Sequence, residues 1–409
     1  MKEQQNMVLT HLRTELYMNW SNNWRWFVER IDKIKRIMEK KEIDLAIIHN
    51  PLEIFYFTGN MVQGMLFIPL EEDPVLFIRR PKERPIKKTL TYQYIDRLGE
   101  ILSYPLSWKN IKKIGVEKDI TTLSMLERIK KILPYGEFED ISLEIRSLRM
   151  IKDEEEINKI RKAGKIIDSL FAKAKELINE GITERELALE LEYISKQMGN
   201  IGIYRMRNRD NEASFAHILS GANTLVSSYL DAPTGGMGIS SAFPQGPSNR
   251  KFKKGEPIGI DIMINYDGYI TDATRTFVIG EIPDKLKLLN QKLMEIFSIL
   301  KENLIPGNTA EEVALKALET AKKLGVDDIF MGIGRDRVKF IGHGVGLEVD
   351  EFPFIMRGFK IPLRENVVVA VEPKLMDPEL GMVGIENTFL ITEKGLESLI
   401  KFEEDLIRI

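Results

Sequence analysis

The amino-acid sequence predicts an α/β protein of two domains, and its length, composition and order of elements support this fold class. The chain has 409 residues, which is more than one typical domain holds. Hydrophobic residues make up 43% of the chain and charged residues 30%, so the chain can bury a packed core and is not expected to be disordered. Strand-like and helical patterns alternate in the first third of the chain, as they do in small α/β domains.

The first domain is expected at residues 23–148, after an N-terminal extension at residues 1–22. Apolar residues at a spacing near 3.6 predict a helix over Trp26–Lys41. Short apolar runs predict buried strands, and the last of these runs is followed by another helix. These predicted segments are strands at 44–49, 65–69, 74–78 and 111–117 and a helix at 123–133.

The second domain is expected at residues 149–409 and contains two similar pairs of helices. A charged helix is predicted over about 153–179, and the next helix opens with a capping box at Thr183–Glu186. A second pair repeats this order, with a helix at Asp284–Asn303 and another helix start after Pro306. Each half continues into strands that carry carboxylates, which indicates a duplicated α+β unit.

The bulk composition excludes several classes of protein. With 59 basic and 62 acidic residues the net charge is −3, which argues against nucleic-acid binding because such proteins usually carry a basic excess. The absence of cysteine excludes disulfides, thiol nucleophiles and cysteine-ligated zinc, and it fits a reducing cytoplasm. The N-terminus is too polar for a signal peptide, and no apolar stretch is long enough to cross a membrane. We therefore expect a cytoplasmic protein.

Five residues toward the C-terminal end indicate a metal site: Asp261, Asp272, His343, Glu372 and Glu386. They lie in apolar, strand-like runs or beside glycines, where an uncompensated carboxylate costs several kcal/mol. No equal set of lysines or arginines is interleaved with the acids, so a pair of divalent ions is the simplest compensation. The glycines on both sides of His343 are expected to allow close backbone approach to a ligand.

Two predicted hairpins would bring the four acids together. The turn signal Tyr266-Asp-Gly-Tyr269 lies between Asp261 and Asp272, so paired strands can place both carboxylates on one face. A second turn signal at residues 377–381 lies between Glu372 and Glu386 and repeats the arrangement. Two facing hairpins can deliver all four carboxylates to one pocket.

The charges and donor types of this set predict a dinuclear centre. Four carboxylates balance two divalent ions, and His343 adds one neutral nitrogen ligand. Oxygen-rich ligation with one imidazole and no sulfur favours Mn²⁺ or Co²⁺, with Fe²⁺ or Zn²⁺ as further candidates. Such a pair of ions lowers the pKa of water and polarises a carbonyl oxygen, so the chemistry expected is hydrolysis of an amide-like bond.

The motifs around these residues resemble those of a known family, the pita-bread metallopeptidases (peptidase family M24). The resemblance is closest to the branch of Xaa-Pro dipeptidase (prolidase), aminopeptidase P and creatinase, and it covers most of the chain. It implies a creatinase-like N-terminal domain, a pita-bread catalytic domain and an Xaa-Pro dipeptidase or aminopeptidase activity. The motifs are Asp267–Phe277, Gly342–Glu348, Val371–Pro373 and Gly384–Glu386, with Ile43–Ile48 and Tyr56–Gly59 in the first domain.

The resemblance also implies a role for each ligand. Asp261 would bind one metal, and Asp272 and Glu386 would bridge both. His343 and Glu372 would complete the other metal. Glu372 is also the expected proton shuttle, because a carboxylate beside the attacking water can act first as base and then as acid.

The sequence departs from the family pattern at two histidines that normally contact the scissile carbonyl. Their positions hold Asp350 and Ser228. A carboxylate at Asp350 would oppose an oxyanion, and His217 is the candidate that could fill one of the two roles. The alternative function is therefore a divergent non-peptidase of the same fold, a C–N hydrolase or C–S lyase in which Asp350 acts as base. A metal-binding interaction module is the third possibility.

Several residues are candidates for the substrate pocket. Arg205, in a cluster with Arg207 and Arg209, and Arg357 could clamp a substrate carboxylate, because guanidinium binds carboxylate in a bidentate manner. Tyr229 and Asp231 are expected to line the pocket. The expected partner is a small peptide or other small molecule, and the protein is expected to form a homodimer. We interpret Trp20, Trp24 and Trp26 as residues of packing or of a dimer contact, and the alternative is that they cap the substrate across a dimer.

Overall fold

The computed structural model describes residues 25–84, 86–107, 111–207 and 211–409. The chain divides into two units, Met1–Leu148 and Arg149–Ile409. The predicted N-terminal extension, which includes Trp20, lies outside the described residues. The same holds for Trp24 and Arg209. Over the described ranges, every helix falls short of the length or the apolar character that crossing a bilayer requires.

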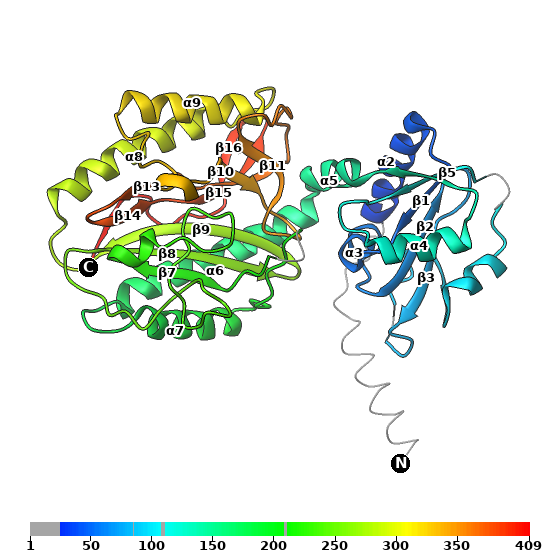
Figure 1. Cartoon of the computed structure of the whole chain (residues 1–409), viewed down its shortest axis with the longest axis horizontal. Helices are drawn as coiled ribbons and strands as arrows, with labels where there is room; N and C mark the ends of the chain where they lie inside the picture. Colours follow the sequence, from blue (N-terminus) through cyan, green and yellow to red (C-terminus); the bar gives the residue numbers. More distant parts are fainter. Residues whose placement is uncertain (1–24, 85, 108–110, 208–210) are drawn as a thin grey trace, which may run out of the picture. The chain divides into compact units, whose positions relative to one another are not determined.

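The first unit is built on one sheet of six strands with the order β4-β3-β2-β1-β5-β6 (Figure 1). Strand β1 is buried along its whole length and β2, β3 and β5 are mostly buried, as their apolar runs predict, and these strands form one core with the buried face of α4. The predicted helix at residues 26–41 and the four predicted strands are confirmed within two residues at most ends. The elements are α2 (Arg25–Lys41), β1 (Leu45–Ile48), α3 (Pro51–Thr58), β2 (Gln63–Pro69), β3 (Val75–Arg80), β4 (Thr91–Tyr94), β5 (Lys113–Val116), α4 (Leu123–Ile132), β6 (Glu137–Asp140) and α5 (Ser142–Met150), which continues past Leu148.

The second unit contains two helix pairs with two larger sheets between them, and β13 and β14 form a small third sheet (Figure 1). The first pair packs on the sheet β17-β9-β8-β7, and the second pair packs on the sheet β11-β10-β12-β15-β16. The first half contains α6 (Glu154–Leu177), α7 (Glu184–Gln197), β7 (Ala216–Ser220), β8 (Pro257–Tyr266) and β9 (Tyr269–Val278). The second half contains α8 (Asp284–Asn303), α9 (Ala310–Lys323), β10 (Phe340–Gly344), β11 (Glu351–Met356), β12 (Val368–Val371), β13 (Lys374–Asp377), β14 (Gly381–Gly384), β15 (Asn387–Thr392), β16 (Gly395–Ser398) and β17 (Ile407–Arg408).

The two halves begin their second helices in the same way. At the start of α7, the Thr183 side chain accepts a hydrogen bond from the backbone N–H of Glu186, and the Glu186 carboxylate accepts from the backbone N–H of Thr183. Thr309 and Glu312 form the same capping box at the start of α9. Each box satisfies N–H groups that the first helical turn leaves without partners. The predicted helix starts are thereby confirmed.

Both predicted hairpins are present, although the second is built differently. The β8–β9 hairpin closes through Asp267 (φ 50°) and Gly268 (φ 93°), the left-handed pair that a tight two-residue turn requires. In the second hairpin, β13 pairs with β14 near the turn and β12 pairs with β15 farther from it. Glu372 and Glu386 lie at the break between these two ladders, in neither strand pair.

A row of hydrogen bonds joins the two halves beside the four acids. The backbone N–H of Glu386 donates to the carbonyl oxygen of Thr274 at 3.0 Å, and the N–H of Thr274 donates to the carbonyl oxygen of Glu386 at 3.3 Å. The hydroxyl of Thr276 donates to the carbonyl oxygen of Gly384 at 2.8 Å and accepts from its N–H at 3.0 Å. Strand β9 is thus fixed directly against the segment that carries Glu386.

A buried ion cluster holds the loop that follows β10. The carboxylate of Glu351 lies 2.5 Å from Arg149 Nη2 and 2.7 Å from Lys152 Nζ, and it accepts from the backbone N–H of Leu347 at 2.7 Å. Burial opposes ionisation of Glu351, but Arg149 and Lys152 outweigh burial and lower the pKa of this carboxyl to about 2. The ionised form therefore belongs to the folded state at neutral pH.

We expect Glu351→Gln to destabilise the protein in a pH-dependent manner. Because the pKa of Glu351 in the folded state is below its value of 4.5 in the absence of these contacts, its contribution is present above that value and is lost as pH falls toward about 2. The free energy of unfolding should drop by on the order of 3 kcal/mol at pH 7, because the buried Lys152 loses its carboxylate partner and the buried Arg149 loses one carboxylate and keeps Glu348. Urea unfolding at a series of pH values measures this difference.

The matched control is Glu319→Gln, which removes an exposed carboxylate paired with Lys323 on α9. This control should change stability little at any pH, because exposed ion pairs contribute little. An equal loss of stability for Glu351→Gln at pH 7 and at pH 3 would contradict the assignment, since the charge would then not be the source of the effect.

Candidate metal centre

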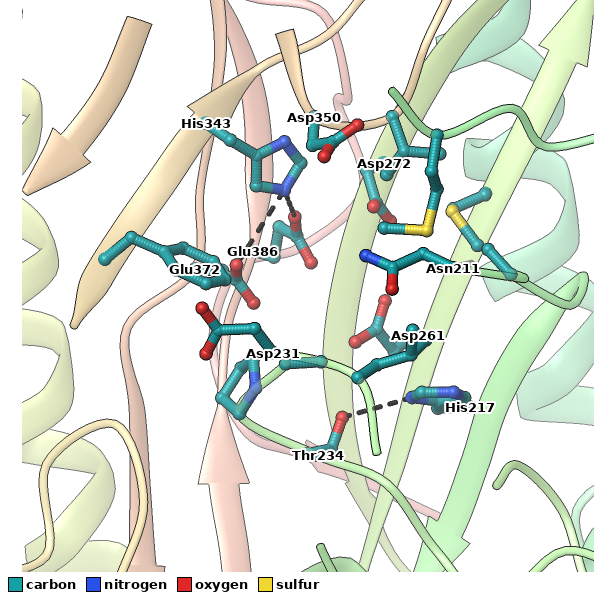
Figure 2. Close-up of a pocket in the computed structure, with 18 of the residues that line it drawn as sticks. Asn211, His217, Asp231, Thr234, Asp261, Asp272, His343, Asp350, Glu372 and Glu386 are labelled. Atoms are coloured by element: carbon teal, nitrogen blue, oxygen red, sulfur yellow. Dashed lines mark hydrogen bonds and ion pairs between the residues drawn. The ribbon is translucent and has the colours of Figure 1, made fainter. Parts of the chain in front are cut away.

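All five predicted ligands line one cavity of about 460 Å³ in the second unit. Figure 2 shows the side chains of Asp261, Asp272, His343, Glu372 and Glu386 around this cavity. Four of them are buried, with exposed fractions of 6% or less, whereas Asp261 is partly exposed at the cavity wall. Acids that are far apart in the sequence therefore converge in the fold.

The two-residue period of a strand places Asp261 and Asp272 on one face of the hairpin. In β8, the alternate residues Ile258, Ile260, Ile262 and Ile264 pack in the core with α6 and α7. Asp261 therefore lies on the opposite face, toward the cavity. Asp272 in β9 is paired with Met263, which shares the face of Asp261, so both carboxylates enter the same space.

His343 lies in β10 between two glycines whose role differs from the one expected. A Cβ atom on Gly342 would lie 2.4 Å from the carbonyl oxygen of Ala370, and one on Gly344 would lie 2.1 Å from that of Phe352. The glycines therefore allow the strands on both sides of β10 to approach it closely, whereas the sequence analysis expected them to allow the approach of a ligand. This close packing holds the His343 backbone in position.

Three of the residues form a group that can hold a cation. Asp272, His343 and Glu386 each offer a ligand atom, and these atoms lie within 4.8 Å of one another. His343 Nε2 is also 3.8 Å from Glu372 Oε1 and 3.9 Å from Glu386 Oε1, as the dashed lines in Figure 2 show. These separations suit donor atoms that converge on one ion.

The electrostatics of Asp272 and Glu386 also require a cation. Burial raises the pKa of each of these two carboxyls well above the ordinary value of that group, and the other acids of the cluster raise each pKa further. Asp272 Oδ1 and Glu386 Oε1 are buried and have no hydrogen-bond partner among the described residues. A divalent ion bound between them would satisfy both oxygens and offset the repulsion.

The structure adds one residue that the sequence analysis missed, the fully buried Lys374. Its Nζ lies 2.5 Å from Glu372 Oε2, 3.2 Å from Asp261 Oδ2 and 3.7 Å from Glu386 Oε2. Burial alone would lower the pKa of Lys374, but the charges of these three acids outweigh burial and hold the pKa well above its ordinary value. The feature of the sequence that could have identified Lys374 is its position two residues after Glu372 in an otherwise apolar run.

Two further predicted residues, His217 and Asp350, line the same cavity. His217 lies opposite Asp261 in the β7–β8 ladder, and its Nδ1 is 3.4 Å from Thr234 Oγ1 (Figure 2). Burial lowers the pKa of His217, and the charge of Asp261 partly offsets this effect. Asp350 Oδ1 accepts a hydrogen bond from the backbone N–H of Arg207 at 3.3 Å.

Of the remaining candidates, only Asp231 lines this cavity. Arg205, Ser228 and Arg357 are not among the residues that line this cavity. Arg357 is exposed, whereas the Ser228 hydroxyl accepts a hydrogen bond from the N–H of Leu230. Asp231 lines the cavity as expected, and Tyr229 is not among the lining residues.

Lys339 is a second lysine that the sequence analysis missed. It lines the cavity immediately before the strand β10 that carries His343. The only feature of the sequence that could have indicated Lys339 is its position four residues before His343. This spacing alone does not distinguish a site residue from a solvated lysine.

A cavity lined by four carboxylates and one imidazole is typical of a metal-dependent hydrolase. The model of metallopeptidase family M24 matches residues 158–393, and the model of the creatinase/prolidase N-terminal domain matches residues 30–151. The chain belongs to metallopeptidase family M24. Membership implies divalent metal ions at the active site, and the group of Asp272, His343 and Glu386 fits this requirement.

Similar proteins of known name agree with this family. The Xaa-Pro dipeptidase of Pyrococcus furiosus is 32% identical over 386 residues, which cover 93% of this chain and 99% of that protein. The crystal structure of the prolidase from Pyrococcus horikoshii OT3 matches with a TM-score of 0.77 and 28% identity, over 93% of this chain and 100% of that one. The X-Pro aminopeptidase from Thermotoga maritima matches with a TM-score of 0.75 and 25% identity, over 91% and 100%.

These comparisons confirm the predicted fold class, a creatinase-like N-terminal domain followed by the pita-bread catalytic domain. They also confirm that the protein is an enzyme and a metallopeptidase. The relatives named above are peptidases, and no finding favours the alternative of a C–N hydrolase or C–S lyase.

We expect Glu386→Gln to remove most of the bound metal. The substitution keeps the shape of the side chain but takes away one negative ligand from the group that includes Asp272 and His343. Metal content after exposure to Mn²⁺ and desalting should fall at least about tenfold, as is common when a ligand or its support is lost. Glu379→Gln is the control, because Glu379 lies at the turn of the same hairpin and pairs with Lys285. Retention of metal by Glu386→Gln would exclude Glu386 as a ligand.

Proposed function

We propose that this enzyme is an Xaa-Pro dipeptidase that depends on divalent metal ions. The observation that carries the proposal is the cavity in which the four acids and His343 lie together with charged residues of both signs. The names of the similar proteins, Xaa-Pro dipeptidase, prolidase and X-Pro aminopeptidase, support the same substrate class.

The metal supplies Lewis acidity, which polarises the scissile carbonyl and lowers the pKa of the attacking water. The side chains of the cavity then move protons and position the substrate. Glu372 would take a proton from the water and deliver it to the leaving amine, because its carboxylate lies on the cavity beside His343. His217, on the opposite wall, would donate a hydrogen bond to the carbonyl oxygen as negative charge develops there.

The charges of the cavity wall favour a substrate with two free termini. Asp231 and Asp350 would attract the α-amino group of the first residue, and Lys339 would pair with the carboxylate of the second. A cation placed to bind this carboxylate favours a dipeptidase over an aminopeptidase acting on longer chains. Arg205, Arg357 and Ser228 stay predictions as substrate-binding residues.

Several finer properties belong to the same proposal. We propose Mn²⁺ or Co²⁺ as the metal, with Fe²⁺ or Zn²⁺ as further candidates, because oxygen donors dominate the site. We further propose that the enzyme is a homodimer and acts in the cytoplasm. Metal analysis of protein isolated from its own source, and light scattering of the purified chain, test the metal and the dimer.

We expect the enzyme to hydrolyse dipeptides with proline in the second position. A panel of Xaa-Pro dipeptides, Xaa-Ala dipeptides and Xaa-Pro tripeptides, followed by amino-acid release, measures this preference. Chelation should abolish turnover, and Glu372→Ala should lower kcat at least about a hundredfold, which is a typical contribution of a general base. Absence of turnover for every Xaa-Pro dipeptide with metal bound would remove the proposal.

We expect Lys339→Met to raise KM for an Xaa-Pro dipeptide about tenfold, since a charge-assisted contact contributes about 1.5–3 kcal/mol. The same variant should leave KM nearly unchanged for the corresponding Xaa-Pro amide, which lacks the carboxylate. Arg357→Met is the matched comparison, because Arg357 is exposed and outside the cavity. If Arg357→Met raises KM and Lys339→Met does not, the carboxylate is bound by the residue first predicted from sequence.

A further inference from the structure

The carboxylate cluster already contains one cation, the ammonium group of Lys374. Its Nζ is 2.5 Å from Glu372 and 3.2 Å from Asp261, two of the five predicted metal ligands, and 3.7 Å from Glu386. Lys374 is fully buried, so water screens its charge from these acids only weakly. The ammonium group is therefore in ionic contact with three of the four acids.

The protein backbone is shaped to hold this lysine. Lys374 pairs with Gly384 in the β13–β14 ladder, and a Cβ atom on Gly384 would lie 2.7 Å from Lys374 Cγ. Only the absence of a side chain at Gly384 leaves room for the lysine to lie against β14 and reach the acids. The carbonyl oxygen of Lys374 also accepts a hydrogen bond from the N–H of Met331 at 2.9 Å.

The rest of the cluster leaves one position for a metal ion. Asp272, His343 and Glu386 offer mutually close ligand atoms, and two of these three residues carry the unpartnered oxygens Asp272 Oδ1 and Glu386 Oε1. Asp261 and Glu372 are outside this group and are the two acids with the shortest distances to Lys374. Asp261 and Glu372 thus lie against the ammonium group, Asp272 and His343 face a site for one divalent ion, and Glu386 contacts both.

The charges agree with this division. Four carboxylates with Lys374 and one divalent ion leave one negative charge, which a substrate amine or a proton can offset. A second divalent ion would have to bind Asp261 and Glu372 within a few ångströms of the ammonium group, where like charges repel strongly. It would also compete with the ammonium for oxygens that are already hydrogen-bonded to it.

We infer that Lys374 occupies the place of the second cation, so that the enzyme binds one divalent ion per chain at Asp272, His343 and Glu386. This inference concerns the metal centre of the proposed function and replaces the dinuclear site expected from the sequence with a mononuclear one. Lys374 is in this view a positioning residue that fixes Asp261 and Glu372.

Counting metal ions tests the inference without any substrate. The wild-type protein is saturated with Mn²⁺ and desalted, and the metal is measured by mass spectrometry against protein concentration from amino-acid analysis. We expect one ion per wild-type chain and two per chain in Lys374→Met, which keeps the length of the side chain and removes its charge. The Mn²⁺ electron paramagnetic resonance spectrum should show an isolated ion in the wild type and a spin-coupled pair in the variant.

Lys285→Met is the matched control, because Lys285 also contacts two acids of this hairpin, Asp377 at 2.8 Å and Glu379 at 2.7 Å, but lies outside the cavity. It should keep one ion.

Two ions in the wild type overturn the inference, whether or not Lys374→Met folds. One ion in both wild type and Lys374→Met overturns the role of Lys374, and no ion in the wild type overturns the site itself. Peptide turnover is measured separately. If the wild type binds two ions and hydrolyses Xaa-Pro dipeptides, only this inference is rejected. If the wild type binds one ion and does not hydrolyse them, only the proposed function is rejected.

Discussion

Four carboxylates within one cavity, three of them buried, repel one another, and the catalytic unit depends on the cations that offset this repulsion. Without compensation, each buried carboxylate would take up a proton or cost several kcal/mol of stability. Lys374 compensates part of this charge from within the chain. Among the described residues, Asp272 Oδ1 and Glu386 Oε1 have no hydrogen-bond partner, so this part of the charge is left for a bound cation to compensate. The excess negative charge of these acids destabilises the fold without a metal, and the same charge gives the site its affinity for a divalent ion.

The convergence of the acids follows from strand periodicity, which is why so much of the site could be predicted from sequence. Asp261 and Asp272 flank a two-residue turn at positions that must share one face of a hairpin, and the neighbouring isoleucines show which face is buried against helices. The capping boxes at Thr183 and Thr309 are equally local signals, and both appear where the sequence indicates. Interactions between residues close in sequence were therefore sufficient for these elements.

Other parts of the site depend on contacts that no local pattern records. Nothing in the local sequence distinguishes Lys374 from other residues of a short strand, and the space that Gly384 leaves beside its side chain arises only from the β13–β14 pairing. The break between the β12–β15 and β13–β14 ladders places Glu372 and Glu386 outside regular strands, whereas the sequence suggested one continuous hairpin. Arg205 and Arg357 had suitable chemistry, but the paths of their loops are set by tertiary packing, and neither side chain lines the cavity.

The segment Thr274–Phe277 shows why a family motif need not consist of site residues. Arg275 is fully buried, and its guanidinium donates to the carbonyl oxygens of Glu386 and Phe402 and to the side chain of Asn387. Burial lowers its pKa to about 10, yet at neutral pH it remains a cation. Because it contacts the backbone of Glu386 and not its carboxylate, Arg275 adds positive potential near the cluster without occupying a carboxylate oxygen. A lysine could not span these acceptors, since only guanidinium offers several fixed donors at once. Arg275 thus joins β9 to the segment carrying Glu386, and the position of Glu386 depends on the packing of both halves.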